Sequence, residues 1–72
     1  MDIRRRVGLN LKRLRDVKGW SQEEFADKAG LHRTYVSGVE RGVRNPTLTV
    51  LEKLATGLQV SLADLIQPPD QP

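Results

Sequence analysis

Apolar residues recur along the chain at the spacing of a helix. Ile3, Val7, Leu11 and Leu14 follow one another at steps of four, four and three residues, so they share one face of a helix. Most of the arginines and lysines between them fall outside this face. No segment of the sequence keeps the alternation of apolar and polar residues that marks a strand. The pattern therefore predicts an all-α protein.

Capping signals predict where the helices begin and end. Polar residues precede four of the expected helices, at Ser21, His32, Thr47 and Ser61. Ser21 is followed by Glu24 at the third helical position, and this spacing allows each side chain to bind the backbone N–H of the other residue. Helices are expected to stop near Gly19, Gly30, Gly42, Pro46 and Gly57. The expected helices span residues 2–18, 22–29, 33–40, 48–56 and 62–66.

Length and composition limit the protein to one small domain. A chain of 72 residues cannot support two cores, and with 4% aromatic residues its core must come mainly from aliphatic side chains. We expect residues 1–66 to form a five-helix bundle without a large ligand cavity. The Pro-rich residues 67–72 should form a tail or the start of a linker. No small-molecule ligand and no membrane span are evident, and the cytoplasm is the expected location.

The residues on which most enzymes and metal sites depend are missing. There is no cysteine, and the single histidine, His32, has no second histidine or cysteine with which to share a metal ion. The sequence also lacks a phosphate-binding glycine loop and a nucleophile with a base placed by a motif. We therefore expect no enzymatic activity, no metal and no cofactor.

Positive charge is concentrated in two segments. The net charge is +3, with +5 over residues 1–20 and +2 over residues 31–45, whereas residues 21–30 and 46–72 each carry −2. The arginines at positions 4, 5 and 6 are expected on a solvated helix face, and a nonspecific attraction to phosphates remains open. This uneven distribution mildly favours nucleic acid as the partner.

A helix-turn-helix is predicted between Ser21 and Glu40. Two expected helices are joined there by Gly30, Leu31 and His32, a three-residue turn with glycine of the kind that lets two helices meet near a right angle. At 100° per residue, the second helix turns Val36, Val39 and Glu40 inward. It turns Thr34, Ser37, Gly38 and Arg41 outward, with Arg33 and Tyr35 on the flanks. Such a short, donor-rich face suits the edges of bases in a major groove about 12 Å wide.

Several coupled motifs carry a resemblance to a known family. The carriers are GWSQEEFA at residues 19–26, VSGVERG at residues 36–42, NPTL at residues 45–48, and the segments 14–15, 29–30 and 51–58. With these motifs the chain resembles the lambda-repressor and Cro proteins, also called the Xre family, over nearly its whole length. The segment RTYVSGVER at residues 33–41 is similar, more narrowly, to the controller proteins of bacterial restriction-modification systems. The resemblance implies a compact bundle of the lambda-repressor type that binds double-stranded DNA.

The same resemblance implies roles for individual residues. Bases would be read by Arg33, Thr34, Tyr35, Ser37 and Gly38, where glycine would let the helix come close to DNA. Phosphates would be held by Gln22, Arg41, Arg44 and Asn45. Arg15 and Glu40 look like the family's largely buried ion pair between the first and third helices, a structural element rather than a DNA contact.

The leading hypothesis is a sequence-specific transcriptional regulator that binds operator DNA as a homodimer. Half-sites would lie about one helical turn apart, with one recognition helix in each. The candidate dimer surface is apolar and lies near the C-terminus: Leu58, Val60, Leu62, Leu65 and Ile66. The alternative that the short last helix simply closes the core stays open. Two other hypotheses are a protein-interaction module, such as an antitoxin-like or adaptor domain, and the DNA-binding part of a longer regulator.

Overall fold

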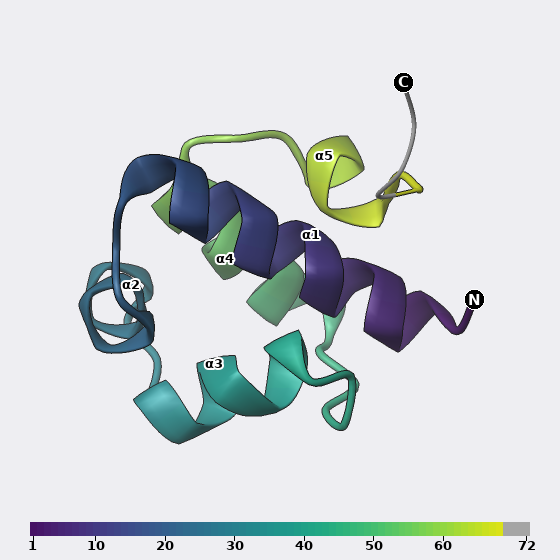
Figure 1. Cartoon of the computed structure of the whole chain (residues 1–72), viewed down its shortest axis with the longest axis horizontal. Coiled ribbons are helices and arrows are strands. Elements are labelled where there is room, and N and C mark those ends of the chain that lie inside the picture. The colour runs from purple at the N-terminus through teal and green to yellow at the C-terminus, as the bar shows by residue number, and fades with distance from the viewer. Residues whose placement is uncertain (69–72) are drawn as a thin grey trace.

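A computed structural model describes residues 1–68 of the chain (Figure 1). Over this range the fold is all-α, as predicted, with five helices and no strand: α1 (Ile3–Lys18), α2 (Gln22–Ala29), α3 (Arg33–Glu40), α4 (Leu48–Leu58) and α5 (Leu62–Ile66). No helix in this range is long and apolar enough to cross a membrane. Part of the expected tail, residues 69–72, lies outside the described residues.

Three of the four predicted capping residues, Ser21, Thr47 and Ser61, cap their helices through their side chains. The hydroxyl of Ser21 accepts a hydrogen bond from the Glu24 N–H at 3.0 Å, while the Glu24 carboxylate accepts one from the Ser21 N–H at 2.9 Å. Ser61 forms the same reciprocal box at the start of α5. His32 precedes α3 without a capping hydrogen bond from its side chain. The first helix begins at Ile3 rather than residue 2, because Asp2 stands outside the helix and caps it through the Arg4 N–H.

The fourth helix is longer than predicted. It continues through Gly57 to Leu58, and the chain leaves it at Gln59, which has a left-handed φ of 63°. The reason for the glycine is packing against α2: a Cβ atom at position 57 would lie 3.0 Å from the Phe25 ring and 3.3 Å from the Cβ atom of Ala29. Gly57 therefore lets α4 and α2 approach each other, and it does not end the helix.

An aliphatic core fills the space enclosed by the helices. Fully buried side chains come from all five helices: Leu11, Phe25, Val36, Val39, Leu54, Leu58 and Leu65. Trp20 stacks on Phe25 with 6.3 Å between the ring centroids. On the same face of α1 as the buried Val7 and Leu11, Ile3 is 52% exposed at the first position of the helix.

The first helix organises the others. In Figure 1, α3 and α5 lie on opposite sides of α1, and α4 passes behind it. Gly8 brings α1 against the end of α3: a Cβ atom there would lie 2.5 Å from the carbonyl oxygen of Glu40. On the other side, the buried Asn10 amide donates to the carbonyl oxygens of Leu65 at 2.8 Å and Gln67 at 2.7 Å. The helix that carries the candidate site is thus held on α1 by a close backbone approach.

Candidate nucleic-acid interface

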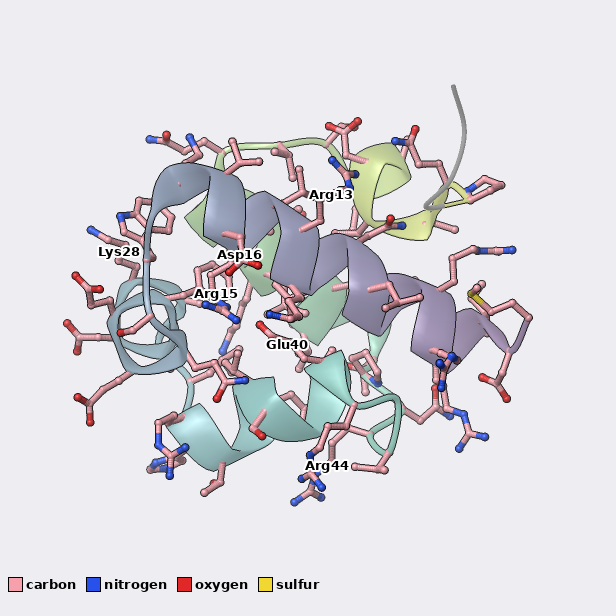
Figure 2. The ribbon with its side chains drawn as sticks, viewed as in Figure 1. Arg13, Arg15, Asp16, Lys28, Glu40 and Arg44 are labelled. Atoms are coloured by element: carbon pink, nitrogen blue, oxygen red, sulfur yellow. The ribbon has the colours of Figure 1, made fainter. Side chains whose placement is uncertain are left out.

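The third helix lies at the edge of the molecule with one face turned outward. The turn before it begins at Gly30, where φ is 72°, and the Leu31 N–H binds the carbonyl oxygen of Ala26 at 2.8 Å. Val36 and Val39 are fully buried, which confirms the predicted inner face. The opposite face looks away from α1 (Figure 2). The local geometry of a helix-turn-helix is therefore present, with α3 as its second helix.

The predicted base-reading residues differ in their exposure. Arg33 and Thr34 are exposed at the start of α3, and Tyr35 and Ser37 are half-buried further along it. Gly38 was expected on the outward face, but the structure buries it. The physical reason is that the chain after α3 folds back and covers Gly38 with the side chain of Arg44.

Arg44 joins the loop after α3 to the helix itself. The backbone N–H groups of Val43 and Arg44 both donate to the carbonyl oxygen of Gly38, at 3.0 Å and 3.2 Å. The Arg44 guanidinium carbon lies 5.5 Å from the centroid of the Tyr35 ring, a cation–π distance. Figure 2 shows Arg44 at the outer side of α3. Of the other residues expected to hold phosphates, Arg41 and Asn45 are exposed in the same loop.

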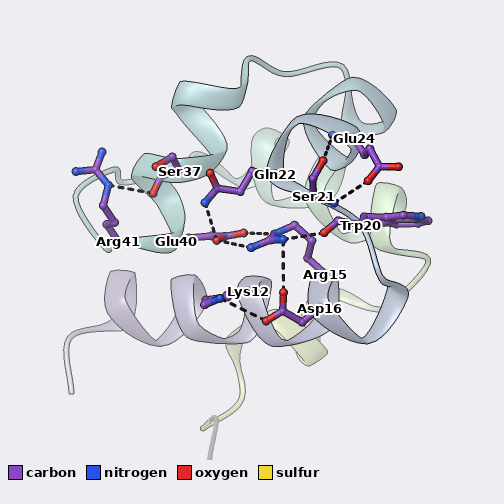
Figure 3. Close-up of polar contacts among 10 residues, drawn as sticks. All are labelled: Lys12, Arg15, Asp16, Trp20, Ser21, Gln22, Glu24, Ser37, Glu40 and Arg41. Carbon is purple, nitrogen blue, oxygen red and sulfur yellow. Dashed lines mark hydrogen bonds and ion pairs between the residues drawn. The ribbon is translucent and has the colours of Figure 1, made fainter.

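Gln22, also expected to hold a phosphate, is engaged within the protein. Its side-chain amide donates to Oε1 of Glu40 at 3.0 Å, and the residue is half-buried (Figure 3). This bond uses one of the two hydrogens that the amide nitrogen carries. The first residue of α2 is therefore fixed against the last residue of α3.

The expected ion pair between α1 and α3 is present and nearly dry. Nε of Arg15 lies 2.7 Å from Oε2 of Glu40, and Nη2 lies 3.0 Å from Oε1, while the two side chains are only 9% and 4% exposed. Nη1 of Arg15 also donates to the carbonyl oxygen of Trp20 at 2.7 Å (Figure 3). The bonds to Glu40 raise the pKa of Arg15 above its ordinary value. Together these bonds fix the end of α3 relative to α1 and α2.

The prediction of the dimer surface was wrong for two residues. Leu58 and Leu65 are fully buried, because α5 packs back on α1 and α4 and encloses both side chains in the core. Leu62 is 38% exposed, and Val60 and Ile66 are half-buried. Only these three of the five candidates keep apolar surface available to a partner.

Comparison with known proteins gives a family match and close relatives. Residues 11–65 match the family described as Helix-turn-helix, HTH_3. An uncharacterized HTH-type transcriptional regulator, y4dJ of Sinorhizobium fredii, is 46% identical over 71 residues, which cover 99% of this chain and 92% of that protein.

Two solved structures share the fold at high sequence identity. The hypothetical transcription factor NHTF from Neisseria superposes with a TM-score of 0.90 at 47% identity, covering 94% of this chain and 78% of that one. The restriction-modification controller protein C.AhdI from Aeromonas hydrophila gives a TM-score of 0.83 at 47% identity, covering 86% of this chain and 90% of that one. The similarity to controller proteins therefore extends from the recognition segment to the whole fold.

Proposed function

Since this chain belongs to the Helix-turn-helix family and is a DNA-binding transcriptional regulator, we propose that it reads operator DNA by placing α3 in the major groove. The observation that carries the proposal is the division of α3 into two faces. Val36 and Val39 are fully buried, while Arg33 and Thr34 are exposed beside each other at the start of the helix. The N-terminal residues of a recognition helix are those that reach base edges. In a bacterial cell such a regulator would act in the cytoplasm.

Arg33 is the residue with the clearest base-reading chemistry. Its planar guanidinium matches the two acceptors that guanine presents in the major groove, and such a bidentate contact discriminates by about 1–3 kcal/mol. Thr34 offers a hydroxyl and a methyl group, which suit a base edge or the methyl group of thymine. Tyr35 and Ser37, half-buried further along α3, would contact a base edge or a nearby phosphate.

Phosphate contacts would set the register of the helix on DNA. Arg41 and Asn45 are exposed in the loop after α3, and Arg44 lies beside them. Gln22, at the start of α2, keeps one amide hydrogen for a phosphate while Glu40 holds the other. Each phosphate that the protein neutralises steepens the dependence of binding on salt, with a slope of about −0.9 per contact.

Selection of bound sites from random double-stranded DNA at stated salt tests the proposal. The wild-type chain should enrich one sequence, and Arg33→Ala should lose the preference at one base pair of each half-site. Arg13→Ala is the matched control, because Arg13 is an exposed arginine of α1 that lies on the side of α5 rather than α3 (Figure 2). If the wild-type chain enriches no sequence, or if the two variants behave alike, the proposal fails.

We also propose that the chain binds as a homodimer through Val60, Leu62 and Ile66. This apolar surface lies around α5, on the side of α1 opposite to α3, so a partner there leaves the recognition helix free. Leu62→Lys should lower the sedimentation coefficient to that of a monomer at micromolar concentration. Val17→Lys is the control, because Val17 is 76% exposed but belongs to the last turns of α1. A wild-type chain that stays monomeric on operator DNA would contradict this part of the proposal.

A further inference from the structure

Gly38 is an unexpected residue in the middle of α3. Glycine is among the least favourable residues in a helix interior. Gly38 is not one of the residues with a positive φ, so the backbone conformation does not demand a glycine there. It is also buried, so it offers little surface to a DNA groove. A reason for this glycine must therefore come from what lies next to it.

The space left by the missing side chain is filled by Arg44. A Cβ atom at position 38 would lie 2.7 Å from Cγ of Arg44, 3.2 Å from Nε and 3.5 Å from Cδ. These three nearest atoms all belong to one flexible side chain. Gly8 is the contrast, because a Cβ atom there would meet backbone atoms of α3. The missing side chain at Gly38 thus makes space for the Arg44 side chain, whereas the one at Gly8 makes space for the backbone of another helix.

The position of Arg44 links the loop to the recognition face. The backbone N–H groups of Val43 and Arg44 donate to the carbonyl oxygen of Gly38, and the Arg44 side chain lies against its Cα atom. Gly38 therefore contacts this loop through both its carbonyl group and its Cα atom. The guanidinium group then reaches the Tyr35 ring, 5.5 Å from its centroid. Tyr35 lies three residues before Gly38 on the same side of α3, as helical spacing requires.

We propose that Gly38 is a positioning residue for DNA recognition, which seats Arg44 along α3 so that Arg44 and Tyr35 meet DNA as one unit joined by their cation–π contact. The proposal rests on the proposed function of α3. A guanidinium group held over an aromatic ring by a cation–π contact gives up less conformational freedom on binding than a free side chain. Arg44 is then part of the recognition helix in function, although it lies in the loop in sequence.

A double-mutant cycle separates this role from a close approach of Gly38 to DNA. Affinity for the selected operator is measured by fluorescence anisotropy for the wild-type chain, Gly38→Ala, Arg44→Ala and the double variant. We expect Arg44→Ala to lose affinity roughly 5- to 100-fold, and Gly38→Ala to lose about tenfold. Because Gly38 acts through Arg44, the double variant should bind as Arg44→Ala does. If Gly38→Ala costs the same factor in both backgrounds, the proposal is overturned.

One further variant, with a matched control, tests the contact between Arg44 and Tyr35 directly. Arg44→Lys keeps the charge but lacks the planar group, so it should lose most of the affinity that Arg44→Ala loses while the salt dependence of binding stays unchanged. Arg13→Lys is the matched control, because Arg13 is an exposed arginine on the side of α1 that faces α5 (Figure 2), and this variant should bind as the wild-type chain does. Wild-type affinity in Arg44→Lys overturns the proposal. A wild-type chain that enriches no operator would instead refute the proposed function itself.

Unfolding in urea tests whether the loss of DNA affinity in Gly38→Ala is a loss of fold. The added methyl group meets only a flexible side chain, and alanine favours the helix, so this variant should be at least as stable as the wild-type chain. A variant that gains stability and loses DNA affinity has the behaviour expected of a glycine retained for function. If Gly38→Ala were destabilised to the same degree as its affinity falls, Gly38 would be structural.

Discussion

Replacing Gly8 by alanine should destabilise the protein, although alanine is the better helix former. In an unconstrained helix the substitution would gain about 0.5–1 kcal/mol. At Gly8 the new Cβ atom would lie 2.5 Å from the Glu40 carbonyl oxygen and 2.9 Å from its carbon, and would also press on the carbonyl oxygen of Val39. Real Cβ atoms do not come this close to backbone atoms. Relief therefore requires α1 and α3 to move apart.

The cost of that movement can be estimated from the contacts that it disturbs. Overpacking a well-packed interior costs about 1–3 kcal/mol, and here the obstacle is backbone that cannot rotate away. Separation of the helices would also lengthen the 2.7 Å bond between Arg15 and Glu40. After subtraction of the gain in helix propensity, we expect a net loss of about 1–2 kcal/mol. For a domain of this size that corresponds to a melting temperature lower by roughly 5–15 °C.

The fluorescence of Trp20, the single tryptophan, reports the loss in urea titrations because this residue stacks on the buried Phe25. The midpoint should fall while the slope of the transition stays constant. Gly38→Ala serves as the control, since it adds the same methyl group to the interior of a helix where only the Arg44 side chain must move. If Gly8→Ala proves as stable as the wild-type chain, the close approach of α1 and α3 does not constrain the fold, and the reasoning fails.

Three other changes address the remaining contacts. Glu40→Gln removes the buried carboxylate that faces Arg15 and leaves it only the exposed Asp16 carboxylate, 3.5 Å away, so the free energy of unfolding measured in urea should fall by up to about 3 kcal/mol; an unchanged midpoint would show that the pair contributes nothing. Asn10→Asp replaces the donor to the carbonyl oxygens of Leu65 and Gln67, so amide hydrogen exchange should quicken across α5, with α2 as the internal reference. Hydrogen bonds from the side chain and the backbone N–H of Arg4 lower the pKa of Asp2 from 3.8 to about 2, so the cap of α1 should be complete above pH 4 and be lost as the pH falls towards 2. In NMR titrations the amide chemical shift of Arg4 should follow this loss in the wild-type chain. In Asp2→Asn the same shift should stay constant from pH 4 to pH 2, because asparagine caps without titrating.

Capping residues predicted the first residues of the helices well, because a helix start depends only on residues close to it in the sequence. The hydroxyls of Ser21 and Ser61 accept a hydrogen bond from the backbone N–H three residues on, and the carboxylate of that residue accepts one in return, so a short stretch of sequence carries the whole signal. Helical periodicity likewise placed Val36 and Val39 on the inner face of α3. Periodicity does not tell which element covers a face, and for this reason Leu58 and Leu65 were assigned to a dimer surface although α5 encloses them in the core.

The glycines show more clearly that local sequence does not tell which distant part of the chain packs against a residue. Gly30 ends α2 with a φ of 72°, a role that sequence alone indicates. The glycines inside helices instead mark places where another part of the chain comes close: the backbone of α3 at Gly8, the Arg44 side chain at Gly38, and the Phe25 ring at Gly57. Those neighbours are distant in sequence, or lie in a loop whose path the sequence does not specify. For this reason a helix end was predicted at Gly57 and a DNA-facing position at Gly38, and the sequence indicated no role for Gly8.

The position of α3 depends on contacts far from its outward face. Gly8 lets the end of the helix rest on α1, and the bonds from Arg15 and Gln22 to Glu40 hold that same end to α1 and α2. These contacts fix the last residue of α3, Glu40, whereas Arg33 is the first residue of the helix. A small rotation of α3 about Glu40 would therefore move Arg33 more than it moves Glu40. Substitutions at Gly8 or Glu40 should consequently weaken operator binding by misplacing Arg33, even under conditions where the variant remains folded. Loss of DNA affinity in a substitution that touches no DNA is thus expected from the way this fold supports its recognition helix.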